Sequence, residues 1–180
     1  KKLLKFIEPY EFRERFTMPK FLINACGDQF FLPDSWKFYY RDLVGQKHLR
    51  YVPNTGHSLN GTDAVYSMAS YFNAILNETK LPDYDWNILA DGSIKVTTLN
   101  RPKEVLLWQC TNTEARDFRI EVTGKTWVSR QLRSDGKGSY LAKVSEPPKG
   151  WTAFMVELTF PEIEKRSNTK KLGERLGKSN

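Results

Sequence analysis

The first half of the chain alternates between short apolar runs and helical periodicity. One run covers residues 21–26 and ends at Gly27, and a second covers residues 48–52. Short apolar runs bounded by turn residues are typical of strands buried on both faces of a parallel sheet. Helical patterns follow each run, one beginning at Pro33 and one at about residue 61. The order strand, helix, strand, helix predicts an α/β layer with parallel strands over residues 1–80.

The second helical pattern, over residues 61–77, also predicts which side chains are buried. Val65, Met68, Phe72 and Ile75 recur at steps of three and four residues. That spacing places them on one stripe of a helix, and we expect the stripe to pack on the sheet.

The second half of the chain, from Trp86 to Pro161, changes to β periodicity with frequent turn residues. Its last segment alternates apolar and polar side chains, as a strand with one buried face does. Seven short strands in about 75 residues is the size of an immunoglobulin- or fibronectin-III-like sandwich. The seven predicted β segments are 86–90, 94–99, 104–110, 117–122, 126–132, 139–144 and 152–160.

These patterns divide the chain into three parts. We expect an α/β segment over 1–80, a β-sandwich over 81–161 and a basic, disordered tail over 162–180. The expected fold class is an α/β layer with parallel strands followed by an all-β, immunoglobulin- or fibronectin-III-like sandwich. The mean hydropathy is −0.57, and no apolar run approaches the roughly 18 residues of a membrane helix.

The net charge of +7 lies mainly in the tail. Residues 165–180 hold six Lys or Arg side chains and one Glu, which leaves a net charge of about +2 for the rest. A nucleic-acid-binding face needs a basic stripe with interleaved aromatics, and the body of the chain mixes both signs. We therefore expect no nucleic-acid partner.

Cysteine usage leaves the compartment open. Cys26 and Cys110 each lie among apolar neighbours, so buried free thiols are the simplest interpretation, although a bridge between them is an alternative. Glycosylation sequons at Asn60 and Asn77 weakly favour secretion. Neither a metal-ligand cluster nor a phosphate-binding glycine loop is evident, so no metal and no cofactor are predicted.

Two polar residues follow the predicted parallel strands. Asp28 comes after the first strand and His57 after the second. Ligands of open α/β sheets lie at the carboxyl ends of the strands, and an acid followed by a histidine is the end of the Ser…Asp…His order of α/β-hydrolases. A serine hydroxyl needs an imidazole base, which a carboxylate orients and stabilises. A turn residue and a solvated histidine are the alternative interpretations.

Several motifs around these residues resemble the PhoPQ-activated pathogenicity-related protein family. The resemblance covers about residues 7–161, and it corresponds to the C-terminal portion of a family member. Members include bacterial virulence-associated proteins and a secreted amoebal repressor of proliferation. The motifs that carry the resemblance are residues 27–35, 49–57, 107–109, 115–119 and 150–154.

The resemblance implies a secreted or exported α/β-hydrolase with a β-rich extension. It implies that Asp28 and His57 are the acid and base of a catalytic triad, and that the nucleophilic serine lies upstream. The chain has no Gly-x-Ser-x-Gly motif, and Ser58 in the histidine's own loop is a poor nucleophile candidate. We therefore expect the 180-residue chain to be inactive alone. The upstream half of the same protein is its expected partner.

An aromatic cluster follows Asp28 and has two interpretations. Phe30, Phe31 and Trp36 are candidates for a substrate pocket that would take a peptide or ester. Aromatic side chains at helical spacing are more often core residues, and that alternative is favoured. A second function also stays open, in which the scaffold is not catalytic and binds a cell surface or a protein partner as a signalling molecule.

Overall fold

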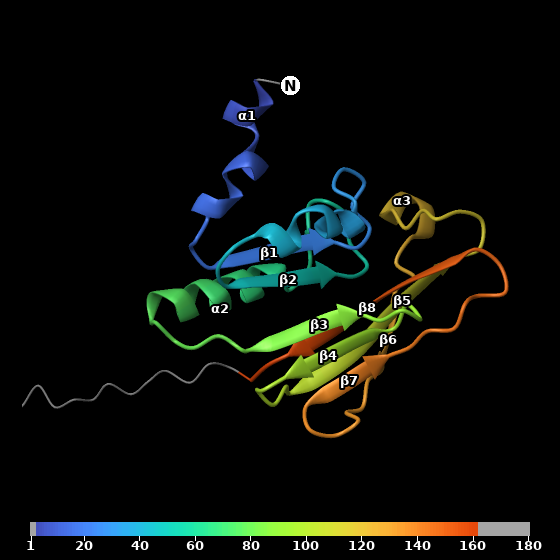
Figure 1. The fold of residues 1–180 in the computed structure, drawn as a ribbon. Helices are drawn as coiled ribbons and strands as arrows, with labels where there is room; N and C mark the ends of the chain where they lie inside the picture. The colour runs from blue at the N-terminus through green and yellow to red at the C-terminus, as the bar shows by residue number, and fades with distance from the viewer. Residues whose placement is uncertain (1–2, 162–180) are drawn as a thin grey trace, which may run out of the picture.

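The computed structural model describes residues 3–161. These residues form three small sheets and few helices (Figure 1). The helices are α1 (Leu4–Ile7), α2 (Ala64–Leu76) and α3 (Ile120–Thr123), with 3₁₀ helices η1 (Pro9–Arg15), η2 (Pro33–Phe38) and η3 (Tyr40–Asp42). The strands are β1 (Lys20–Ala25), β2 (Lys47–Val52), β3 (Tyr84–Ile88), β4 (Ile94–Thr98), β5 (Glu104–Asn112), β6 (Val128–Gln131), β7 (Ser139–Ala142) and β8 (Trp151–Thr159).

The expected fold class is wrong. The described residues do not have an α/β-hydrolase layout, because only β1 and β2 are parallel and α2 is the only helix longer than four residues apart from the 3₁₀ turns. Residues 33–42 form two 3₁₀ helices where an α-helix was expected. The chain is mainly β, with its strands in sheets of two, three and three.

The two apolar runs of the first half do pair in parallel, as predicted. Ala25 lies opposite Val52 at the carboxyl ends of β1 and β2. Those two residues are buried, whereas the preceding residues of both strands are half-buried. We call β1, β2, α2 and their connecting loops (20–80) the parallel layer.

The predicted buried stripe of α2 is wrong. Val65, Met68 and Phe72 are all more than half exposed, and only Ile75 of the four predicted residues is half-buried. The helix instead turns Ala64 and Ala74 inward, and Tyr71 packs on Phe21 of β1 with ring centroids 5.0 Å apart. The larger apolar side chains of the helix are left on its exposed face.

Six strands make up the β-rich part (84–159), which lies below the parallel layer in Figure 1. Antiparallel sheets form in the orders β3-β4-β7 and β6-β5-β8. The predicted strand at 117–122 is absent, because this stretch contains the single turn α3. The immunoglobulin-like sandwich is therefore not confirmed.

The sheet β6-β5-β8 contributes to two apolar clusters on its opposite faces. Val105 and Leu107 of β5 join the β3-β4-β7 sheet in the first cluster, as do Phe154, Val156 and Leu158 of β8. This confirms the alternation predicted for the last strand. The second cluster joins Cys110 of β5 and Met155 of β8 to Cys26 of the parallel layer. The parallel layer thus completes its core with side chains of the β-rich part.

The two cysteines are free and buried in this second cluster. The division at residue 80 stays a prediction, and the expected disordered tail lies outside the described residues. No helix within residues 3–161 has the length and apolar character to cross a membrane.

Candidate functional site

The carboxyl ends of β1 and β2 form the base of the candidate site. Backbone hydrogen bonds continue the pairing past the strands, from Cys26 N–H to Val52 O (2.9 Å) and from Gly27 N–H to Thr55 O (3.1 Å). Parallel strands end at the same edge of a sheet. The residues that follow, Asp28 and His57, are therefore brought to one place.

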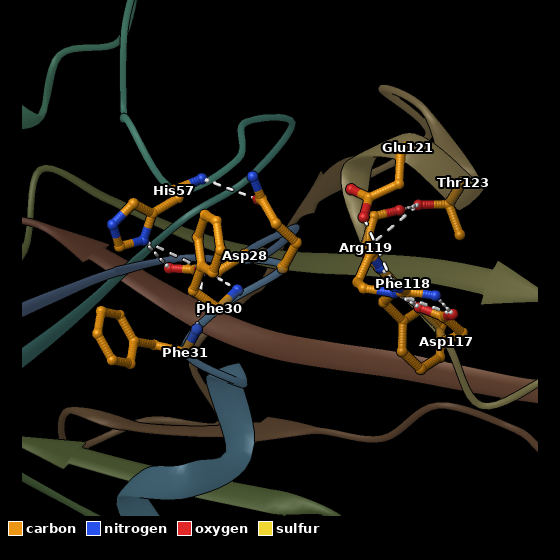
Figure 2. Close-up of polar contacts among 10 residues, drawn as sticks. Asp28, Phe30, Phe31, His57, Asp117, Phe118, Arg119, Glu121 and Thr123 are labelled. Carbon is orange, nitrogen blue, oxygen red and sulfur yellow. Dashed lines mark hydrogen bonds and ion pairs between the residues drawn. The ribbon is translucent and has the colours of Figure 1, made fainter.

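Asp28 and His57 face one another at this edge (Figure 2). Nδ1 of His57 lies 3.1 Å from Oδ2 and 3.2 Å from Oδ1 of Asp28. The Asp28 side chain is 5% exposed and the His57 side chain 43% exposed. The other ring nitrogen points away from the carboxylate in Figure 2. The contact expected from the sequence is present, with a buried acid and an accessible imidazole.

The electrostatics of Asp28 favour its ionised form. Burial acts to raise its pKa, but hydrogen bonds from the backbone N–H groups of Phe31 (2.9 Å) and Phe30 (2.8 Å), together with His57, lower the pKa below its ordinary value. A carboxylate can accept the Nδ1 proton of His57. The neutral ring then carries its hydrogen on Nδ1 and has a lone pair on Nε2 that can accept a proton.

Two of the three predicted pocket residues lie beside the histidine. The Phe30 ring meets the His57 ring edge-on at 5.0 Å, and the Phe31 ring is tilted at 5.2 Å. Both phenylalanines are more than 60% exposed. Trp36 lies elsewhere and packs edge-on against Trp86 of β3, with centroids 4.8 Å apart. The structure thus brings Phe30 and Phe31 to His57, but not Trp36.

Three supporting residues were missed from the sequence. Gln29 Oε1 accepts the backbone N–H of His57 at 3.4 Å. Asn54 binds the backbone of Trp127 through its side-chain amide, and Ile120 of α3 packs on the backbone before Asp28. Gly56 directly precedes His57, as Gly27 directly precedes Asp28, and a glycine can indicate that another segment packs closely on its backbone. The sequence does not indicate that Ile120 is the residue that packs there, or that Asn54 binds Trp127.

A nucleophile next to His57 is not found among the described residues. No serine hydroxyl in residues 3–161 is hydrogen-bonded to the His57 ring, and the hydroxyl of the neighbouring Ser58 lies 3.5 Å from the backbone N of Asn60. Nor does this part of the chain hold a group of three or more His, Cys, Asp or Glu side chains placed to bind a metal. Within the described residues, the arrangement thus consists of a carboxylate and an imidazole, with no hydroxyl bound to the ring.

A shallow hollow of about 600 Å³ lies at the amino end of β2. Lys47, His48 and Tyr84 are among its lining residues, which do not include Asp28 or His57. It is separated from the acid–base pair by the length of the strand, so we do not assign it to the same site.

Comparison with known proteins gives one family and one curated relative. Residues 1–119 match the family described as PhoPQ-activated pathogenicity-related protein. Autocrine proliferation repressor protein A of Dictyostelium discoideum is 32% identical over 180 aligned residues, which cover 88% of this chain and 36% of that protein. The chain thus spans about a third of the length of that curated relative. No solved structure matches the chain significantly.

Proposed function

The chain belongs to the PhoPQ-activated pathogenicity-related protein family, and on that premise we propose that Asp28 and His57 are the acid and base of a serine-hydrolase reaction. Peptides and esters are the proposed substrates. The observation that carries the proposal is the buried Asp28 carboxyl group within 3.2 Å of Nδ1 of an accessible imidazole. The nucleophilic serine would lie in a part of the whole protein outside these 180 residues, since the relative is nearly three times as long.

The pair suits the proton transfers of acyl transfer. His57 Nε2 would take the proton of the serine hydroxyl as the serine oxygen bonds to the substrate carbonyl carbon. The same proton would pass to the leaving amine or alkoxide when the carbon–nitrogen or carbon–oxygen bond breaks. Asp28 would remain ionised and stabilise the imidazolium formed between the two transfers.

Phe30 and Phe31 would contact the substrate next to the reacting carbonyl. Both rings are exposed and adjoin the imidazole. Their apolar faces favour a substrate with an aliphatic or aromatic group at that point. We further propose that the whole protein acts after secretion or export.

Labelling of the whole protein with a fluorophosphonate probe tests the catalytic proposal. The wild-type protein should form a covalent serine adduct, and Asp28→Asn should lower the labelling rate by up to about 10⁴-fold, as in comparable triads. Asp34→Asn is the matched control, because Asp34 is bound to Arg116 and Lys37 instead of the histidine. Labelling of Asp28→Asn at the wild-type rate would contradict the assignment.

A second function is favoured by the exposed apolar surface around His57. Phe30 and Phe31 beside the His57 ring are each more than 60% exposed, and exposed apolar patches mark protein contacts. The relative's name, autocrine proliferation repressor, describes a signalling protein. In this alternative the site binds a partner without chemistry. A whole protein that binds a partner through these phenylalanines but does not react with the probe would favour it.

A further inference from the structure

The loops that carry Asp28 and His57 are both bound to one segment of the β-rich part, residues 119–127. We propose that Asn54 and Ile120 are positioning residues that hold these loops in register. In this view the β-rich part is integral to the acid–base site. The proposed catalytic role rests on the function proposed above, but the geometric claim does not.

Asn54 joins the histidine loop to the β-rich part through two hydrogen bonds. Its side-chain oxygen accepts the backbone N–H of Trp127 at 2.9 Å, and its side-chain nitrogen donates to the backbone oxygen of Trp127 at 2.9 Å. Trp127 is buried beside Cys26 and Cys110. The Asn54 side-chain amide thus binds both polar groups of the Trp127 backbone, as the backbone of a neighbouring strand would. Asn54 lies three residues before His57.

The backbone of Asn54 is suited to this role. Its φ is +58°, a left-handed conformation that Asn adopts more readily than most other side chains. Asn54 lies two residues after the end of β2, where its side chain reaches the backbone of Trp127. An alanine here would lose both hydrogen bonds and strain the turn.

Ile120 lies against the backbone that precedes both functional residues. Its N–H donates to Gly27 O at 3.0 Å. A Cβ added at Gly27 would lie 2.9 Å from Ile120 Cβ, and one added at Gly56 would lie 3.0 Å from Ile120 Cγ2. A single side chain thus covers the residue before Asp28 and the residue before His57.

This double contact explains how an exposed histidine can keep a fixed geometry. The His57 side chain is 43% exposed, and the two phenylalanine rings next to it are themselves exposed, so packing around the ring alone holds it weakly. Hydrogen bonds weaken steeply as they lengthen and bend, and productive acid–base geometry tolerates about 0.5 Å of error. Ile120 and Asn54 limit the movement of the two loops relative to one another.

The test is a spectroscopic measurement on His57 in the whole protein. In Asn54→Gly the left-handed backbone is retained, since glycine populates it freely, and only the two side-chain hydrogen bonds are lost. Imidazole ¹⁵N NMR should show the Nδ1–H tautomer for wild-type His57 and a mixture of tautomers for the variant. If the wild type is active, kcat/KM should fall at least about tenfold with little change in KM.

Two controls separate positioning from general damage. Lys137→Gly also changes a residue with positive φ, at +55°, in the turn before β7, and should leave the His57 tautomer unchanged. Ile120→Ala removes Cγ2 and should reproduce the mixture, whereas Ile120→Val retains Cγ2 and should keep the wild-type tautomer. If Asn54→Gly does not fold, the two Ile120 variants decide the question.

The outcomes distinguish this inference from the proposed function. Native-like amide spectra with an unchanged His57 tautomer in Asn54→Gly and Ile120→Ala would overturn the positioning role. A wild-type protein that does not react with the fluorophosphonate probe, while these variants still change the tautomer, would overturn the hydrolase proposal alone.

Discussion

The β-rich part encloses its own core, whereas the parallel layer leaves much of its apolar surface open. Leu107 of β5 and Ala142 of β7 are 0% exposed, but Leu76 at the end of α2 is 65% exposed. Two strands and one helix cannot cover both faces of a parallel sheet, while six strands in two sheets can bury their inner faces on each other. The two neighbouring parts of the chain therefore differ in how fully they bury their apolar side chains.

The acid–base pair belongs to the more open of these two regions. The parallel layer provides the strand ends that bring Asp28 and His57 together. The parallel layer meets the enclosed region in the cluster of Cys26, Cys110 and Trp127. The parallel layer carries Asp28 and His57, whereas Ile120 and Trp127, which contact their loops, belong to the β-rich part.

The largest expected effect is a difference between two leucines. Leu107→Ala should lower the free energy of unfolding by about 2–5 kcal/mol, because it leaves a cavity in the enclosed core. Leu76→Ala should change it by less than about 0.5 kcal/mol, because its side chain is mainly solvated and alanine favours helix. Urea denaturation of both variants measures the contrast. Equal losses would show that α2 is covered in solution and would remove the distinction between the regions.

A smaller effect is expected where the two regions meet, at Gly27. Gly27→Ala should cost about 1–3 kcal/mol of stability, because its methyl group would lie 2.9 Å from Ile120 Cβ, Ile120 N and Thr55 O, two of which are backbone atoms. Gly56→Ala should cost less, since its nearest contact is the Ile120 Cγ2 methyl at 3.0 Å.

A double-mutant cycle with Ile120→Ala separates these two cases. Removing Cγ2 should relieve much of the cost of Gly56→Ala. It should not relieve Gly27→Ala, because the Cβ and N atoms of residue 120 remain. Strictly additive free energies for the Gly56 pair would contradict the close packing at this junction.

The same contrast decides what could be predicted from the sequence. The parallel pairing of β1 and β2, the alternation of β8 and the meeting of Asp28 with His57 follow from local patterns, because strand ends and side-chain alternation are set by neighbouring residues. The buried face of α2 could not be predicted that way. Its apolar stripe predicts burial of Phe72, but Ala64 and Ala74 are the buried residues.

The remaining errors concern contacts between residues far apart in the sequence. The segment at 117–122 has strand propensity, but its second half begins α3, from which Ile120 packs against Gly27 and Gly56. Tertiary contacts of this kind can override local preference. The α/β-hydrolase layout was inferred from two strand–helix units and a resemblance. Two units indicate parallel pairing, but they do not specify how many further strands extend the sheet.

A pH effect on stability is expected at the interface between α2, β2 and β3. His48 of β2 is half-buried next to Tyr71, and its Nδ1 lies 3.1 Å from the Tyr84 hydroxyl. Burial lowers the pKa of His48, although Asp83 opposes this in part. The unfolded state therefore binds protons more readily, so the free energy of unfolding should fall as the pH drops below about 6.5.

Urea midpoints measured between pH 7.5 and pH 5 test this effect. His48→Asn can keep a polar contact with Tyr84 but cannot titrate in that range, so its midpoint should change less than that of the wild type. The same change of midpoint with pH in both proteins would show that protonation of His48 does not lower the free energy of unfolding.

The smallest expected effect concerns the ion pair that joins the regions at the surface. Arg116, in the loop before α3, contacts Asp34 of η2 at 2.9 Å, and together with Lys37 it lowers the pKa of Asp34. Both side chains are substantially exposed, so ordering them and screening by salt offset most of the attraction. Arg116→Gln should lower the free energy of unfolding by about 0.2–1 kcal/mol at low salt, and the difference should vanish near 1 M salt. Chemical denaturation in urea at both salt concentrations measures this difference in the free energy of unfolding.

A loss of more than about 2 kcal/mol, or one that persists at high salt, would mean that this surface pair holds the regions together. The expected small loss instead leaves that role to the buried contacts of Ile120, Asn54 and Trp127.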